Sequence, residues 1–213
     1  MNEDLRFWWS WWVNVAIAVG TVGAVLVALF GERVRGWLFK PRLVLTVPNP
    51  QGERQPVQLR APTGEVRTEE ARFYHLRVTN SARWPKATEV QVFLTRIEDP
   101  GPDGDLQLRW ATEVPVKWKF QEIQPLSRTV GPHADCDLCS VVKNKWVQLH
   151  PLIVPNNLTE FARRRERFDM VLSFEARSAE ASSSPKRIKI SWDGQWHDGE
   201  SEMAKHLVIR ELN

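Results

Sequence analysis

The most constraining feature of this sequence is an uncharged, apolar run of twenty residues from Trp11 to Phe30, WWVNVAIAVGTVGAVLVALF. A helix rises about 1.5 Å per residue, so the run covers roughly 30 Å, the thickness of the hydrocarbon layer of a bilayer. A helix buried in a soluble core would show a polar stripe, and this run has none. A cleaved signal peptide would need a basic leader, whereas the leader here is MNEDLRF. The run therefore predicts a membrane-spanning helix.

Tryptophans flank this run at both ends, and indole rings prefer the headgroup zone because one edge is apolar and the other carries an N–H donor. The predicted interfacial anchors are Trp8, Trp9, Trp11, Trp12 and Trp37. Basic residues are distributed unequally, because Arg6 precedes the run and four basic residues follow it. The four that follow are Arg33, Arg35, Lys40 and Arg42. The positive-inside rule then predicts an outside N-terminus and a cytoplasmic C-terminal part.

These features divide the chain into four parts. Residues 1–10 form a short extracytoplasmic N-terminus, and residues 11–30 form the transmembrane helix. Residues 31–41 form a juxtamembrane segment that Pro41 is expected to end, and residues 42–213 form a cytosolic domain. The expected location is a bacterial inner (plasma) membrane, and the lipid bilayer is therefore the first expected partner.

Small residues recur at every fourth position of the predicted span, at Ala16, Gly20, Ala24 and Ala28. Residues with this spacing share one helix face and let two backbones approach closely, as in small-xxx-small association. The alternative is that small residues are common in spanning helices and that this register arises by chance. The pattern predicts a homo-oligomer associated through this face.

The charge of the C-terminal part argues against a general nucleic-acid binder. The whole chain has a formal net charge of +3. Residues 1–42 contain five basic and three acidic side chains, which leaves 24 basic against 23 acidic side chains for the remainder. Binding to nucleic acid needs an excess of positive charge to displace counterions. In a reducing cytoplasm, the two cysteines, Cys136 and Cys139, are expected to be free thiols.

Apolar residues of the C-terminal part recur with a period of two, which is typical of half-buried strands. In VPVKWKF, the alternating residues are Val114, Val116, Trp118 and Phe120. Similar alternation occurs in YHLRV, VQVFL, MVLSFEAR and RIKISW, with segments rich in Gly, Pro, Asp and Ser between strands. Only residues 157–168 fit a helix. About nine or ten strands without alternating helices predict an all-β domain, an immunoglobulin-like β-sandwich or, on the same pattern, a barrel.

One stretch, HLRVTNSARWPKATEVQVFL, resembles the strand–loop–strand unit of immunoglobulin-like adhesion modules of prokaryotes. The matching positions are Val78, Asn80, Ala87, Val90 and Val92, with Ala82 in place of the usual glycine. The layout also resembles bacterial single-span membrane proteins of unassigned function with a cytosolic immunoglobulin-like β domain, and small membrane effectors of antiphage signalling systems. The resemblance implies a sandwich and brings no catalytic residue.

The segment HADCDLC places His133, Cys136 and Cys139 at three-residue intervals, and His150 is a candidate fourth zinc ligand. A single Cys-x-x-Cys pair is a weak metal motif. The alternative is that Cys136 and Leu138 point into the sandwich while Cys139 lies near its rim. We expect the alternative, in which these residues are part of the sandwich and bind no zinc.

Three aspartates, Asp99, Asp103 and Asp105, lie in the segment DPGPDGD. Loops of some β-sandwich domains hold calcium with such residues, but the spacing does not match an EF-hand loop. A hairpin turn is the better interpretation, because Asp, Gly and Pro are turn-forming residues. We therefore predict no metal and no cofactor.

The strongest local cluster of charge is RRRER, which contains Arg163, Arg164, Arg165 and Arg167. On a membrane-tethered domain these side chains could bind anionic lipid headgroups or a phosphorylated ligand, because guanidinium groups match phosphate geometry. The alternative is a solvated surface segment. The cluster is the candidate anion, lipid or ligand contact of the sequence.

The sequence contains no arrangement specific to an enzyme. His197, Asp198 and Ser201 are close in the C-terminal segment, but no nucleophile elbow, phosphate-binding loop or dinucleotide fingerprint accompanies them. Trp192 and Trp196 could line a small-molecule pocket, although a hairpin whose indoles cover the end of the sandwich is the expected arrangement. The sequence thus predicts a non-enzymatic interaction or ligand-sensing module with an unknown protein partner. A membrane-disrupting effector triggered by a ligand such as a nucleotide is the alternative.

Overall fold

The computed structural model describes residues 3–38, 40–60, 64–82, 86–101, 103–120 and 126–212. The chain divides into two compact units, Met1–Lys40 and Pro41–Asn213. The first unit is one helix and the second is almost entirely β-structure. This confirms the predicted all-β sandwich preceded by one helix.

Helix α1 (Glu3–Leu38) contains an apolar part, Trp11–Gly31, that is long enough to cross a membrane. None of this part is buried among the described residues, so its apolar side chains are exposed along the helix. A Cβ built at Gly20 would meet no atom within 4 Å, and the small residues of the four-residue repeat are exposed. The tryptophans Trp8, Trp9, Trp11 and Trp12 are exposed as well, whereas the side chain of Trp37 lies outside the described residues.

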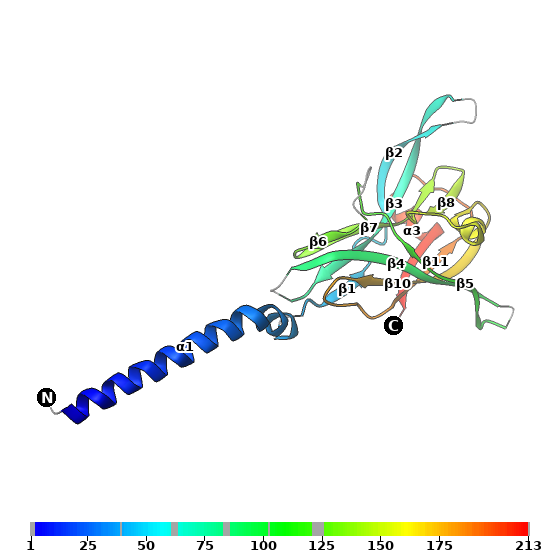
Figure 1. Ribbon diagram of the computed structural model, residues 1–213. Helices are drawn as coiled ribbons and strands as arrows, with labels where there is room; N and C mark the ends of the chain where they lie inside the picture. The colour runs from blue at the N-terminus through cyan, green and yellow to red at the C-terminus, as the bar shows by residue number, and fades with distance from the viewer. Residues whose placement is uncertain are drawn as a thin grey trace. The chain divides into compact units, whose positions relative to one another are not determined.

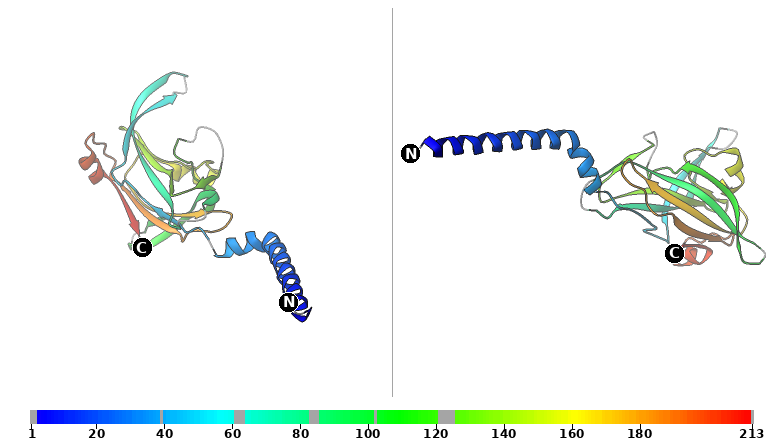
Figure 2. Two further views of the ribbon diagram at one scale, coloured as in Figure 1. Left: turned by 90° about the vertical axis from the view of Figure 1, so that its left-hand side faces the viewer. Right: turned by 60° about the horizontal axis from the view of Figure 1, so that its bottom comes forward.

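In the first sheet of the sandwich, β3 pairs with three strands, β1, β2 and β7 (Figure 1). Its antiparallel path is β1 (Leu43–Thr46), β3 (Val66–Asn80), β7 (His133–Val142), β8 (Trp146–Leu149) and β9 (Arg163–Arg164), and β2 (Glu53–Arg60) pairs with the first half of β3. The outer halves of β2 and β3 project from the sandwich as a two-stranded ribbon (Figure 2).

The second sheet is also antiparallel and packs face to face with the first. Its path is β12 (Leu207–Leu212), β11 (Lys186–Trp192), β10 (Phe168–Arg177), β4 (Ala87–Pro100) and β5 (Leu106–Pro115), and β6 (Arg128–Val130) pairs with the start of β4. The short helices are η1 (Asn156–Leu158), α2 (Thr159–Ala162) and α3 (Glu200–His206). The hairpin expected around Asp103 is present, since β4 and β5 pair on either side of it.

The core forms between the two sheets from the alternating residues that the sequence pattern selects. Among its fully buried side chains are Leu76, Trp118, Leu172, Phe174 and Ile188. Leu76, Leu172, Phe174 and Ile188 belong to strands, in which successive side chains point to opposite faces, and Trp118 forms an isolated bridge with Cys136 just after β5. Burial of side chains of this size contributes about 1.5–3 kcal/mol each, so the core is the main source of stability.

Two local predictions are wrong. Phe120 was expected inside, but it is 80% exposed, because the strand pairing ends at Lys119 and Phe120 adopts a φ of +60° that turns its side chain outward. The helix expected over residues 157–168 forms only at Thr159–Ala162. The chain then extends, because Arg163 and Arg164 pair with β8 as a short edge strand.

The segment that resembles adhesion modules forms the end of β3 and the start of β4, which belong to different sheets. Asn80 Oδ1 accepts hydrogen bonds from the backbone N–H groups of Ala82 (3.2 Å) and Arg42 (3.1 Å). This side chain therefore supports the turn that leaves β3, as expected for asparagine at such a position.

Candidate functional site

The arginine run predicted from sequence does not form one surface. Arg163 lies over the ring of Trp146, with 4.5 Å from its Cζ to the ring centroid, and donates a hydrogen bond to Gln148. Arg164 instead lies over the ring of Phe168, and its Nη1 is 4.0 Å from Asp99 Oδ2. Neighbouring residues of an extended chain point to opposite sides, so the pairing of β9 separates these two side chains.

The remaining two arginines of the run, Arg165 and Arg167, are exposed. Arg167 borders a small hollow of about 110 Å³ together with Asp169, Asp193 and Lys205. The charges of Arg167 and Lys205 are matched by those of Asp169 and Asp193, and His206, which also lines the hollow, contacts Asp193, so the hollow does not favour an anion.

The two cysteines of HADCDLC are both buried in β7. Cys136 and Leu138 face the core as expected, but Cys139 is fully buried and does not lie at the rim. Burial raises the pKa of both thiols well above the ordinary value, which disfavours the thiolate that zinc requires. No group of three or more His, Cys, Asp or Glu side chains suited to a metal ion exists among the described residues.

One serine and one histidine come within hydrogen-bonding distance in the first sheet. His150 Nε2 lies 2.8 Å from Ser140 Oγ, and burial lowers the pKa of His150 to about 4. Within the described part of the chain, no carboxylate hydrogen-bonds the other ring nitrogen of His150, and Ser140 is buried. A catalytic base would need that orienting partner, and a nucleophile would need access to substrate. The pair therefore has the geometry of a structural hydrogen bond.

The outer face of the second sheet carries a different arrangement, which the strand register defines. Ser173 on β10 lies between Arg96 on β4 and Arg187 on β11. Neighbouring strands are about 4.8 Å apart, so the two arginines start roughly 10 Å from each other across Ser173. Glu98, which lies two residues after Arg96, occupies the next row of the same face.

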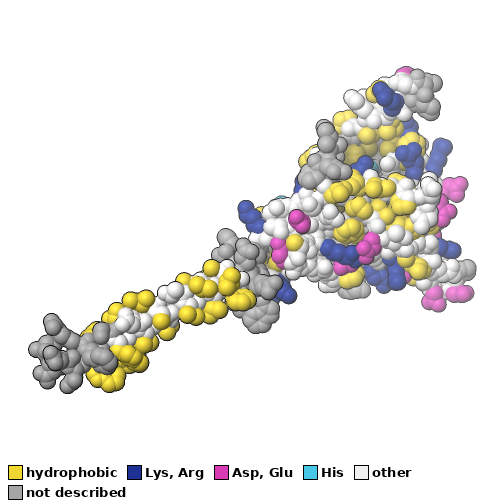
Figure 3. All heavy atoms as spheres, in the orientation of Figure 1, with side chains coloured by type: hydrophobic (Ala, Val, Ile, Leu, Met, Phe, Trp, Pro, Cys, Tyr) yellow, Lys and Arg dark blue, Asp and Glu magenta, His cyan; other side chains and the backbone are white. Residues whose placement is uncertain are grey.

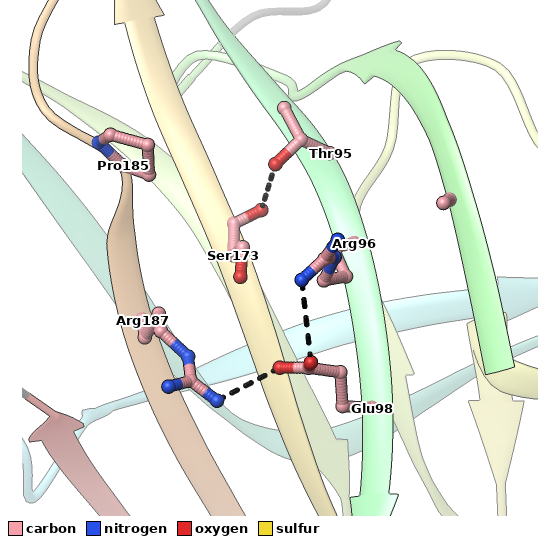
Figure 4. Close-up of a pocket in the computed structure, with 7 residues that line it drawn as sticks. Thr95, Arg96, Glu98, Ser173, Pro185 and Arg187 are labelled. Atoms are coloured by element: carbon pink, nitrogen blue, oxygen red, sulfur yellow. Dashed lines mark hydrogen bonds and ion pairs between the residues drawn. The ribbon is translucent and has the colours of Figure 1, made fainter. Parts of the chain in front are cut away.

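These residues line a groove of about 460 Å³, which Figure 4 shows in close-up. Its lining residues are Thr95, Arg96, Glu98, Ala111, Ser173, Pro185 and Arg187. We call it the arginine groove. Three strands, β4, β10 and β11, fix its floor, so its geometry is set by the sheet and not by a loop.

Glu98 holds both arginines of the groove in place. Arg187 Nη2 donates a hydrogen bond to Glu98 Oε2 at 2.9 Å, and Arg96 Nη1 lies 3.5 Å from Glu98 Oε1 (Figure 4). Glu98 is only 8% exposed, whereas the side chains of Arg96 and Arg187 are 53% and 39% exposed. The carboxylate is therefore a buried anchor, and the guanidinium groups face solvent.

The same face continues with further basic side chains. Lys189 and Arg210 occupy the row of Glu98 on β11 and β12, and Asp169 lies in the row beyond. Asp169 is already paired, because Ser191 Oγ donates to it at 2.5 Å and Lys189 Nζ lies 3.4 Å away, and these contacts hold its pKa below the ordinary value. In Figure 3, Lys and Arg side chains gather around the position of β4 and β10, with carboxylates between them.

Sequence reasoning did not find this groove. Arg187 and Glu98 are 89 residues apart, and no local motif connects them. The alternation of Ile188 and Ile190 predicts that Arg187 points away from the core, but the register that places it beside Ser173 and Arg96 depends on the packing of the whole sheet.

No protein-family model matches the chain, and it has no match among curated proteins. The fold is that of a β-sandwich protein with one helix long enough to span a membrane.

Proposed function

We propose that this protein is a membrane-anchored, non-enzymatic interaction or ligand-sensing module. The observation that carries the proposal is the exposed apolar part of α1, Trp11–Gly31. In water, this surface would be unfavourable along its whole length, whereas in a bilayer it is matched by the hydrocarbon layer. The proposed membrane is the bacterial inner membrane, with the N-terminus outside and the sandwich in the cytoplasm, as the distribution of basic residues favours.

Self-association through α1 is part of this proposal. Ala16, Gly20, Ala24 and Ala28 share one face of the helix, which would let two spans approach closely. Confinement to a surface and pairing of spans both raise the effective concentration of the sandwich domains. Weak contacts between the domain and a partner protein would then suffice for recruitment to the membrane.

The arginine groove is the site that we assign to ligand sensing. It is formed by rigid strands, it is open to solvent, and it presents charged donors around a defined volume. Sites on sheets hold their geometry better than sites on loops, which suits recognition. A non-enzymatic role is supported by the burial of Ser140, the serine beside His150, and by the two thiols that face the core.

Membrane attachment can be tested with a single charge placed in the span. Val22→Arg puts a basic side chain near the middle of the apolar part, where it costs about 2.5–3.5 kcal/mol of insertion free energy. We expect the wild-type chain to remain in membranes after carbonate washing and the variant to be released in larger part. Val22→Leu is the matched control and should stay bound. Release of the wild-type chain by carbonate contradicts the proposal, and protease added to intact cells tests the orientation.

The second candidate function is a membrane-disrupting effector of an antiphage signalling system. The arginine groove favours it specifically, because a phosphate-bearing signal could bind the sandwich and bring the spans together. Expression of the full chain with and without a trigger, followed by measurement of the membrane potential, distinguishes the two candidates. A sensing module leaves the membrane potential unchanged, whereas an effector collapses it. If the protein is an effector, the Val22→Arg variant should leave the membrane potential unchanged.

A further inference from the structure

The arginine groove contains two guanidinium groups that are held in place but have donors left over. Each guanidinium carries five N–H groups. The one hydrogen bond of Arg187 goes to Glu98, and Arg96 makes only the 3.5 Å ion pair with the same carboxylate. Their other N–H groups have no acceptor among the described residues. We propose that the groove binds a phosphate-bearing anion through Arg96 and Arg187.

The geometry of the donors suits a phosphate group better than a simple surface ion pair. Guanidinium groups bind phosphate oxygens through two parallel hydrogen bonds, which requires the plane of the group to be fixed. Glu98, which is nearly buried, restrains the Arg187 guanidinium by a hydrogen bond and holds Arg96 by an ion pair at 3.5 Å. Ser173 lies between them and lines the groove, and although the residue is only 6% exposed, its hydroxyl makes no hydrogen bond to another described residue.

The electrostatics of the face favour an anion. In the two rows that contain Ser173 and Val171, four basic side chains lie with one carboxylate, Glu98; the basic residues are Arg96, Arg187, Lys189 and Arg210. The other carboxylates of this face are already paired, Asp169 with Ser191 and Lys189, and Glu113 and Glu175 with Arg177. Arg210 has no ion-pair partner in the part of the chain that the structure describes, so its charge adds to the field over the groove.

The inference rests on the proposed ligand-sensing role and names the chemistry of the ligand. A volume of about 460 Å³ accommodates a small phosphorylated molecule or the headgroup of an anionic lipid. Both sources present the same phosphate group to the arginines. An experiment with a soluble and a lipid source of phosphate separates the two without changing the binding residues.

Arginine modification reports directly on the groove. The full chain is reconstituted in phosphatidylcholine vesicles and treated with phenylglyoxal, and the modified arginines are quantified by mass spectrometry. Inorganic pyrophosphate at millimolar concentration should slow modification of Arg96 and Arg187. Arg67, whose side chain is 65% exposed on β3, is the internal control and should be modified at an unchanged rate.

A second arm replaces pyrophosphate with phosphatidylglycerol in the vesicles. Selective protection of Arg96 and Arg187 by phosphatidylglycerol alone assigns the groove to a lipid headgroup, whereas protection by pyrophosphate alone assigns it to a soluble phosphate compound. Absence of protection in both arms, or equal protection of Arg67, overturns the inference. Because the reconstituted chain is membrane-bound in each arm, this failure is distinct from failure of the anchoring proposal, which carbonate washing measures.

Substitutions give an independent measurement. Arg187→Gln should weaken pyrophosphate binding in phosphatidylcholine vesicles by about tenfold or more, because a hydrogen bond to a charged group is lost. Arg187→Lys keeps the charge but not the planar donor pair, so its affinity should lie between those of wild type and Arg187→Gln. Arg67→Gln is the matched control. Equal affinity of the Arg187→Gln and Arg67→Gln proteins contradicts the assignment, provided that circular dichroism shows both folded.

Discussion

Arg72 on β3 donates a hydrogen bond to the carbonyl oxygen of Asp198, at 3.4 Å and 126 residues further along the chain. The same guanidinium donates to the carbonyl oxygen of Gln51 at 3.2 Å and lies 3.9 Å from Glu200 Oε1. Arg72 is 0% exposed, and its Nε has no hydrogen-bond partner among the described residues. This buried charge therefore connects the turn before β2 and the segment before α3 at one end of the sandwich.

Replacing Arg72 should destabilise the protein more when the new side chain leaves a larger cavity. Arg72→Ala removes the donors of two carbonyl groups and creates a cavity, so we expect the free energy of unfolding to fall by about 3 kcal/mol. Arg72→Met refills much of the volume and should recover roughly half of that loss. Urea unfolding of the full chain in detergent measures both. Arg67→Ala, on an exposed part of β3, should change the free energy by less than about 0.5 kcal/mol.

Gly52 lies directly against Arg72 and should not tolerate a side chain. Its φ is +72°, and an added Cβ would lie 2.8 Å from Arg72 Cγ and from two ring carbons of Tyr74. We expect Gly52→Ala to cost about 3 kcal/mol, since left-handed strain and overpacking add. Gly64 is the matched control, because its φ is +86° but nothing lies within 4 Å of an added Cβ. Gly64→Ala should cost only about 1 kcal/mol, and an equal cost at the two glycines contradicts the packing argument.

The sequence predicts the parts of this fold that depend on alternation. Tyr74, Leu76 and Val78 were expected on one face of a strand, and all three are buried. The arginine groove could not be predicted in this way, because it depends on the register of β4 against β10. That register shifts between Ser173 and Phe174, whose partners on β4 are Arg96 and Leu94, so Thr95 is left out of the pairing. A bulge changes which residues share a row, and a single sequence carries no signal for it.

Phe120 illustrates the other limit of sequence analysis. In the sequence, the alternation of apolar residues from Val114 to Trp118 continues to Phe120. In the structure, backbone hydrogen bonding to β7 stops at Lys119, and Phe120 is exposed. The end of a strand is set by its partner strand, which lies elsewhere in the chain. The separation of Arg163 from Arg164 has the same origin, since pairing with β8 and not local helix propensity decides the conformation there.

The two thiols should be unreactive in the folded protein. Burial raises the pKa of both Cys136 and Cys139, so neither forms the thiolate that attacks alkylating reagents. Iodoacetamide at pH 8 should modify neither residue in the native chain and both in urea, as mass spectrometry would record. Rapid native modification contradicts this picture. Zinc measured in the purified protein should be the same for wild type and Cys136→Ser.

His150 should make stability depend on pH in a defined window. Burial lowers its pKa from 6.5 to about 4, and its ring stacks on Phe73 with centroids 5.9 Å apart. Above pH 6.5 the ring is neutral in the folded and unfolded states, so it contributes no pH dependence. Between pH 6.5 and about 4 the unfolded chain binds a proton that the folded protein does not, so the free energy of unfolding falls as the pH falls.

The size of this loss follows from the shift in pKa. A shift of this size corresponds to about 3 kcal/mol, reached once the pH is below the folded-state value. His150→Gln keeps a polar partner for Ser140 but does not titrate, so the variant should lose less stability between pH 7 and pH 4 than wild type does. The carboxylates titrate in both proteins, and the difference between the two curves therefore isolates the ring. A His150 resonance that titrates near pH 6.5 by NMR, or parallel stability curves for the two proteins, would show that the ring is not held neutral by burial.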